Sequence, residues 1–190
     1  MLDELLQQIR ACNVCEASLA FGVNPVVQAC PESKIVIISQ APGLKVHQSN
    51  IPWNDASGDQ LRNWLGVTKE QFYNPELFAL IPMGFCYPGK AASGDLPPRK
   101  ECAPLWHARL LSQMKNVALV LVIGRYAQNY YLKEKKYKTM TENIQHYNDF
   151  LPDYFPLPHP SPRNFIWMNK NQWFAEKVVP ALKNKVAAIL

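Results

Sequence analysis

The sequence lacks a long apolar run, although hydrophobic residues make up 48% of its 190 residues. A membrane-spanning helix needs about 20 consecutive apolar residues, so we expect no membrane partner. The first residues also lack the basic and then apolar pattern of a secretory signal, which favours a cytoplasmic protein. Internal repeats, low-complexity segments and an interdomain linker are missing too. We therefore expect one domain, over residues 1–190, with one full core.

A disulfide framework is not expected, because the five cysteines are an odd number in a chain without a signal sequence. Cys12 and Cys15 are separated by two residues, a spacing that can hold one metal centre. Two further thiolates would complete the coordination of that centre. Three alternatives remain on this evidence: incidental buried cysteines, a thioredoxin-like redox pair and a structural zinc site. The net charge of +5 permits a nucleic-acid partner without requiring one.

Strand and helix patterns alternate along the chain. Short apolar runs, rich in Ile and Val in the first and third, predict buried strands at 34–38, 78–81, 117–123 and 154–157. Helical patterns occupy most of the intervening segments, one of them from about 100 to 114, and both ends of the chain, with a break expected at Pro180. Such alternation predicts an α/β fold in which helices cover both faces of a parallel sheet.

Two polar loops carry the chemistry. The first follows strand 34–38, begins Ser-Gln-Ala-Pro-Gly over residues 39–43 and is expected to run to about Ala56, and the second runs from His159 to Asn164. Ligands bind at the carboxyl ends of strands in open parallel sheets. We therefore expect the two loops to face each other across one cleft.

Loop 39–43 resembles the opening motif of the uracil-DNA glycosylase superfamily, and residues 159–164 resemble its closing His-Pro-Ser motif. The cysteine layout is similar to that of the iron–sulfur branch of this superfamily. The resemblance implies a three-layer α/β/α fold with a four-stranded, mainly parallel sheet. It also implies a structural [4Fe–4S] cluster, with a structural zinc as the alternative, bound by Cys12, Cys15, Cys86 and Cys102.

The resemblance also assigns roles to the cleft residues. Trp53 would stack on the base, and His159 would donate a hydrogen bond to it as it departs. The acidic residues that relatives carry just after the Pro-Gly turn are replaced here by Val46-His47, so the resemblance does not assign the residue that orients the attacking water, and His47 and Asp55 are the candidates in this chain. Backbone N–H groups of the first loop would hold one uracil oxygen. The second loop would contact phosphate or fill the gap that the flipped base leaves in the DNA. These further substrate-binding candidates are Gln40, Ala41, Pro42, Gly43, Ser161, Arg163 and Asn164, with Arg163 and Phe165 as candidate wedges.

We therefore expect a monomeric DNA repair glycosylase that hydrolyses the glycosidic bond of uracil, or a related damaged base, flipped out of DNA. Relatives in this branch usually begin the first motif with Gly-Glu, where this chain has Ser39-Gln40. That difference motivates a second hypothesis, a non-catalytic module that binds damaged or single-stranded DNA. A third is an enzyme acting on free nucleosides. The basic run at 133–138 is interpreted as a solvated surface, with a phosphate contact as the alternative.

Overall fold

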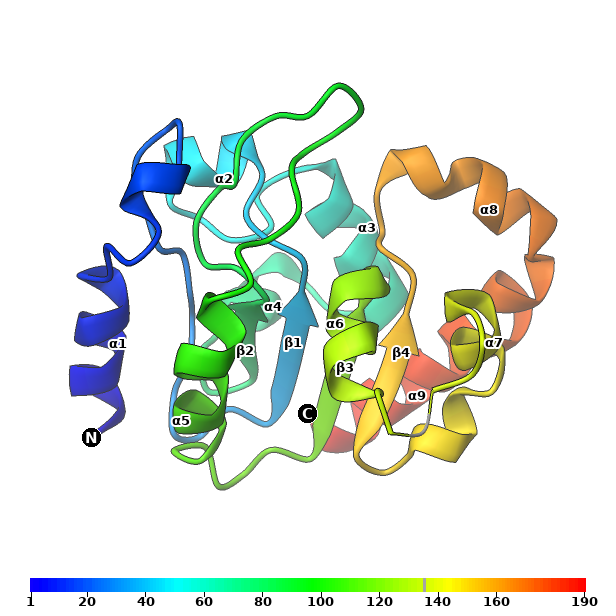
Figure 1. Ribbon diagram of the computed structural model, residues 1–190. Coiled ribbons are helices and arrows are strands. Elements are labelled where there is room, and N and C mark those ends of the chain that lie inside the picture. Colours follow the sequence, from blue (N-terminus) through cyan, green and yellow to red (C-terminus); the bar gives the residue numbers. More distant parts are fainter. Residues whose placement is uncertain (135) are drawn as a thin grey trace.

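The computed structural model describes residues 1–134 and 136–190 (Figure 1). Four strands form one sheet in the order β2-β1-β3-β4, and every neighbouring pair is parallel. The predicted α/β class with a four-stranded sheet is thus confirmed. The strands are β1 (Ile35–Ser39), β2 (Phe78–Pro82), β3 (Leu119–Ile123) and β4 (Tyr154–Leu157).

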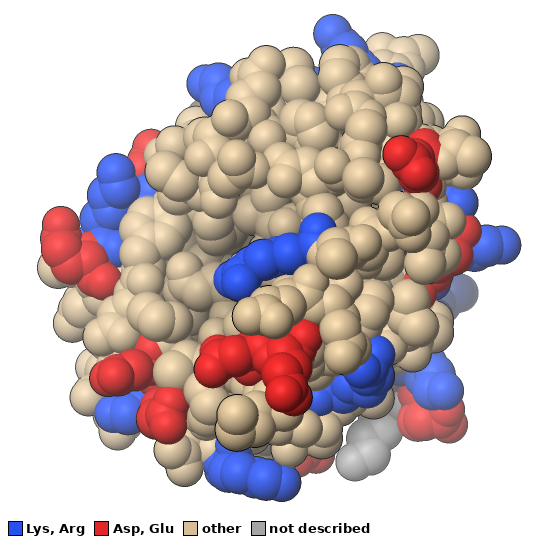
Figure 2. Space-filling model, turned by 90° about the vertical axis from the view of Figure 1, so that its left-hand side faces the viewer, with Lys and Arg blue, Asp and Glu red and all other residues tan. Residues whose placement is uncertain are grey.

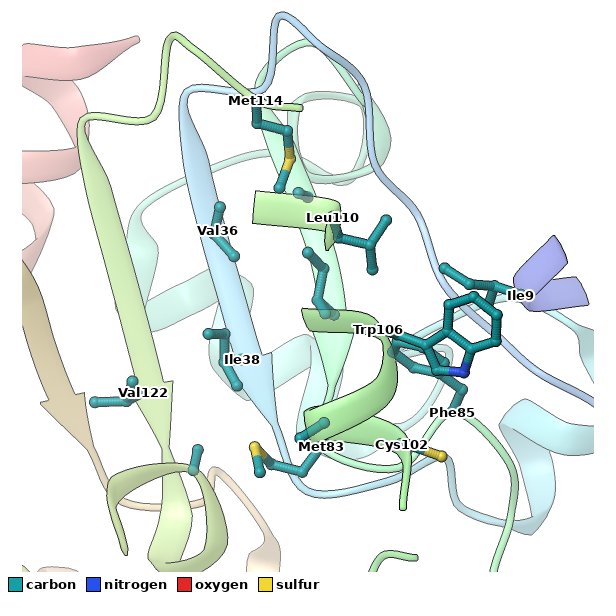
Figure 3. Packing of buried hydrophobic residues seen from close by; sticks show 14 of the residues in the cluster. Ile9, Val36, Ile38, Met83, Phe85, Cys102, Trp106, Leu110, Met114 and Val122 are labelled. Atoms are coloured by element: carbon teal, nitrogen blue, oxygen red, sulfur yellow. The ribbon is translucent and has the colours of Figure 1, made fainter. Parts of the chain in front are cut away.

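The strand residues are apolar on both sides because both faces of the sheet are covered. Val36 and Ile38 of β1 belong to one buried cluster, which Figure 3 shows from close by, together with Trp106 and Leu110. Ile35 and Ile37 point to the other face. These two clusters form the two halves of a three-layer core, which explains why the strands are continuous apolar runs rather than alternating ones.

Helices on the first face include α1 (Leu2–Arg10), η2 (Ala103–His107), α5 (Ala108–Leu111) and α6 (Gly124–Tyr131). The second face is covered by α3 (Ala56–Leu65), α7 (Met140–Gln145), η5 (Phe174–Val178) and α9 (Val179–Ile189). The remaining elements are short: α2 (Leu44–Ser49), α4 (Lys69–Tyr73), α8 (Phe165–Lys170), η1 (Glu16–Ser18), η3 (Tyr147–Phe150) and η4 (Pro162–Asn164). None of the helices in the described ranges is long and apolar enough to cross a membrane.

Three details differ from the prediction. The first polar loop was expected to run to about residue 56, but α2 interrupts it. Pro180 was expected to break the last helix, but the helical stretch continues through it, with the π-type turns of η5 directly before α9. The predicted helix between 100 and 114 contains π-type turns at 103–107 before α5.

A long loop between β2 and η2 rises over the carboxyl ends of the strands, at the top of Figure 1. Lys90 and Asp95 form an antiparallel bridge within it. This loop places groups from residues 88–100 beside the two polar loops predicted to face each other. It therefore forms part of the wall of the candidate site.

Candidate functional site

A cavity of about 450 Å³ opens at the carboxyl ends of the strands. It is lined by the loop after β1, the loop before α3, the long loop after β2 and the loop after β4. The two predicted polar loops therefore do face one cleft. The predicted site residues among its lining are Gln40, Ala41, Pro42, Gly43, Trp53, Asp55, His159, Ser161, Arg163 and Asn164.

The first motif loop is fixed to the segment that follows β2. The carbonyl oxygen of Ser39 accepts a hydrogen bond from the N–H of Met83 at 2.8 Å, and that of Gln40 accepts one from Gly84 at 3.1 Å. Backbone hydrogen bonds between the two segments thus continue past the ends of β1 and β2. This rigidity holds the backbone of residues 40–43 in place at the cavity wall.

Trp53 adopts a left-handed backbone conformation with φ of 58°, which is rare for a bulky residue. Its neighbours explain how it is held. A Cβ on Gly58 would lie 1.8 Å from the Trp53 carbonyl oxygen, so only glycine allows this close approach. Arg62 donates to the same oxygen at 3.4 Å, and the Tyr73 hydroxyl donates to the Pro52 carbonyl at 2.9 Å.

The Trp53 indole stacks on the imidazole of His159, with ring centroids 5.7 Å apart and planes inclined by 26°. Asn164 donates to the backbone carbonyl of His159 at 2.6 Å, which fixes the turn that carries the ring. Burial lowers the pKa of His159, although the charges of Asp55 and Asp95 act in the opposite direction. The imidazole is therefore neutral at neutral pH, with one nitrogen as a donor and one as an acceptor.

Two carboxylates lie on the cavity wall near this ring pair. Asp55 caps the amino terminus of α3, where its Oδ1 accepts a hydrogen bond from the N–H of Gly58 at 2.9 Å. Asp95 comes from the long loop, and its Oδ2 lies 3.7 Å from where a Cβ on Gly43 would be. Asp95 was not predicted as a site residue, because only the folding of its loop brings it to the first motif.

His47 lies outside the cavity lining. Its ring packs near Phe21 and Tyr87, with centroid distances of 6.4 and 5.9 Å. Its Nδ1 is buried and has no hydrogen-bond partner in the described part of the chain. The structure therefore does not bring His47 together with Trp53 and His159.

The four predicted metal ligands, Cys12, Cys15, Cys86 and Cys102, line one small cavity beneath the long loop. Cys30 lies apart from them, and its Sγ is 2.7 Å from Oε2 of Glu32. Among the residues that the structure describes, no three His, Cys, Asp or Glu side chains are grouped to bind a single metal ion. The cavity thus gathers four sulfurs without the compact geometry of one tetrahedral ion.

The surroundings of these thiols suit a group that accepts hydrogen bonds. Arg99 and Trp106 also line the small cavity. Arg99 Nε and Trp106 Nε1 are buried and unpartnered within the described ranges. Burial, together with a smaller effect of the neighbouring thiols, raises the pKa of Cys102 to about 11, although a backbone hydrogen bond at Phe85 acts in the opposite direction. Four thiolates would therefore need a cationic centre between them, and the donor set fits an iron–sulfur cluster.

A buried polar network that the sequence did not reveal lies behind the cavity wall. His107 Nε2 lies 3.1 Å from the carbonyl oxygen of Pro82, at the end of β2, and its Nδ1 lies 2.7 Å from the Tyr131 hydroxyl. A carbonyl can only accept, so Nε2 carries the proton and Nδ1 accepts from tyrosine. Burial lowers the pKa of His107 to about 4 and keeps the ring neutral.

The sequence matches one known protein family over most of its length. A family model described as "Uracil DNA glycosylase superfamily" matches residues 26–183. The crystal structure of wild-type SMUG2 from Pedobacter heparinus aligns with a TM-score of 0.41 and 16% sequence identity. The alignment covers 80% of this chain and 75% of that one.

Proposed function

We propose that this chain, which belongs to the uracil-DNA glycosylase superfamily, hydrolyses the N-glycosidic bond of uracil or a related damaged base flipped out of DNA. The observation that carries the proposal is the stacked pair of Trp53 and His159 in a cavity that also contains two carboxylates. A flat aromatic wall suits a base, and a fixed imidazole suits its polar edge.

The bond breaks with negative charge on the departing base and positive charge on the sugar. His159 is neutral, so it can donate one hydrogen bond to a uracil oxygen as that charge grows. The N–H groups of Gln40 and Ala41 would hold the second oxygen. Preorganised donors of this kind commonly contribute about 100- to 1,000-fold in rate each.

Asp55 and Asp95 are the groups suited to the sugar side of the reaction. A carboxylate can orient a water for attack and also stabilise the positive charge of an oxocarbenium-like transition state. Asp55 uses Oδ1 to cap α3, so its other oxygen would hold the water. Asp95, from the long loop, also lines the cavity and is the second candidate for this role.

The rim of the cavity supplies contacts for DNA itself. Phe165 and Ile166 at the start of α8 are 62% and 67% exposed, which is unusual for large apolar side chains. They follow Arg163 and Asn164, which line the cavity. We place the apolar wedge that fills the gap left by the flipped base at Phe165, with Arg163 directed to the phosphates.

We also propose that Cys12, Cys15, Cys86 and Cys102 hold a [4Fe–4S] cluster in this protein. The cluster would supply no catalytic chemistry and would act as a structural link between the amino-terminal segment and η2. The unpartnered N–H groups of Arg99 and Trp106 would then donate to sulfur. The proposal depends on the shared cavity and on the donors around it.

The glycosylase proposal is tested with a single-stranded oligonucleotide that carries one uracil, followed by alkali to reveal abasic sites. We expect cleavage by the wild type and a loss of at least about 100-fold for Trp53→Ala and His159→Ala. Lys177→Ala, on the second face of the sheet, is the matched control and should cleave normally.

The outcomes separate the hypotheses. Folded protein that binds the oligonucleotide in a salt-sensitive way but leaves no abasic site would favour the non-catalytic DNA-binding module. Release of base from a free nucleoside, without affinity for oligonucleotides, would favour the nucleoside enzyme. Normal cleavage by Trp53→Ala and His159→Ala would refute this site.

A further inference from the structure

A second cavity, of about 630 Å³, lies next to the first. Leu96 of the long loop lines both cavities, so the loop forms the wall between them. The opposite side of the second cavity is formed by Tyr126, Asn129 and Tyr130 of α6. Because α6 begins at Gly124, directly after β3, this cavity is near the same end of the sheet as the proposed base site.

The lining is mostly apolar and aromatic. Three prolines of the long loop face the cavity, together with Leu96 and the two tyrosines of α6. Tyr130 is 41% exposed, yet its ring is supported from behind by Tyr131, at a centroid distance of 5.1 Å, and by His107 at 6.4 Å. It is therefore an exposed ring on a fixed support, which suits a stacking surface.

Cationic side chains lie on this surface and on the neighbouring residues of α6. Lys100 lines the cavity and is exposed. Arg125 lies over the Tyr126 ring at 5.1 Å, and Lys136 Nζ lies 3.4 Å from Oδ1 of Asn129. By contrast, the side of the molecule that carries α1 shows acidic and basic groups interspersed on a mostly uncharged surface (Figure 2). The basic groups near α6 thus complement a phosphate backbone.

We propose that the second cavity binds another nucleotide of the same DNA strand, with its base stacked on Tyr130 and its phosphates near Lys100 and Arg125. This inference rests on the proposed function, because the first cavity must hold the flipped base. Aromatic rings beside cations recognise single-stranded nucleic acid without regard to base identity. Because Leu96 lines both cavities, they are neighbours, and one DNA strand can reach both.

The first experiment measures binding of a fluorescent single-stranded oligonucleotide that contains a 2′-fluorinated deoxyuridine, which resists hydrolysis. Tyr130→Ala should weaken binding by about 5- to 100-fold, because it removes one base–aromatic stack. Tyr130→Phe keeps the ring and should bind like the wild type. Lys100→Ala should reduce the slope of log affinity against log salt concentration by about the contribution of one phosphate contact. Lys177→Ala should leave that slope unchanged.

The second experiment locates the bound nucleotide. Each nucleotide flanking the uracil is replaced in turn by an abasic spacer. The wild type should lose affinity at one flanking position more than at the others. At that position Tyr130→Ala should show little further loss, because the variant and the spacer remove the same contact.

The two proposals fail in different ways. If the wild type cleaves uracil while Tyr130→Ala binds every oligonucleotide as the wild type does, the second cavity does not bind a nucleotide and the glycosylase proposal stands. If the protein binds but never cleaves, and Tyr130→Ala weakens binding, hydrolysis is refuted and the nucleotide site is retained. Absence of both binding and cleavage overturns both.

Discussion

Single residues show how the fold shapes the chemistry. His159 is an ordinary histidine in sequence, but burial keeps it neutral and Asn164 fixes the turn that carries it. Trp53 is likewise held in a left-handed conformation by the surroundings of its carbonyl group. Both properties belong to the environment of the residue and explain why a stacking wall and a hydrogen-bond donor can coexist in one cavity.

Gly58→Ala tests the restraint on Trp53. The added methyl would overlap the Trp53 carbonyl oxygen, so the loop or α3 must move, at a cost of roughly 1–3 kcal/mol in the free energy of unfolding. We also expect the rate of cleavage to fall by more than the loss in the free energy of unfolding would explain, because the stacking ring is displaced. Thermal melting and single-turnover cleavage measure the two effects.

Gly43→Ala is the control for this experiment. The nearest atom to its added methyl is Oδ2 of Asp95 at 3.7 Å, an ordinary contact, and Gly43 has a negative φ of −82°. Stability should therefore change little. Equal stability for Gly58→Ala and Gly43→Ala would show that the close approach at Trp53 is not a restraint.

At the level of elements, α3 is linked to the candidate site, because Asp55, which caps its amino terminus, also lines the cavity. Asp55→Asn should keep the cap, since asparagine and aspartate cap helices about equally well, while it removes the negative charge. We expect nearly unchanged melting and strongly reduced cleavage. Asp55→Ala should lose both the helix cap and the negative charge, so we expect reduced cleavage and a loss of about 1 kcal/mol in the free energy of unfolding.

Asp95→Asn is the partner experiment for the second carboxylate. Asp95 caps no helix, so its charge can be removed without affecting α3. If Asp95→Asn abolishes cleavage while Asp55→Asn does not, Asp95 is the group that holds the water. Normal cleavage by both variants would contradict the proposed role of the carboxylates.

The end of β2 is tied to η2 and α6 by His107, which bonds to Pro82 and Tyr131. Its folded-state pKa of about 4 is below the ordinary value, so it stabilises the fold above about pH 6.5 and this stability is lost as the pH falls toward 4. For the wild type we expect a loss of roughly 3 kcal/mol from this residue over that range.

His107→Phe removes this titration. The variant should be less stable than the wild type at pH 7, because the Pro82 carbonyl and the Tyr131 hydroxyl lose their partner. The difference between the two proteins should shrink as the pH is lowered, as measured by urea unfolding. A difference that is constant with pH would refute the neutral, buried state of His107.

Considering the whole molecule, the four clustered cysteines connect segments far apart in sequence, from Cys12 to Cys102. Protein purified anaerobically should contain iron and acid-labile sulfide and absorb visible light. Cys102→Ser should lose most of this absorbance and unfold more easily. Cys30→Ser is the matched control and should keep both, because Cys30 lies apart. Zinc without iron in an anaerobic preparation would contradict the cluster.

The sequence by itself determined the class of fold and the two polar loops that carry most of the cleft residues. Runs of Ile and Val favour strands in a sheet covered on both faces, and the carboxyl ends of parallel strands lie at one edge, so loops 39–43 and 159–164 were expected on the same side of the sheet. The cysteine spacing, read with the family resemblance, likewise indicated which four thiols belong together. These features follow from local pattern and topology.

Only the tertiary structure decided the details of the site. In the structure, His47 lies outside the cavity lining, Asp95 lies near Gly43, and His107 hydrogen-bonds to the carbonyl of Pro82. Tyr130 lies beside a second cavity. These contacts join loops and helices that are distant in sequence, and their geometry depends on how the side chains pack. A sequence pattern fixes which face of an element is buried, but not which atom of a remote loop lies against it.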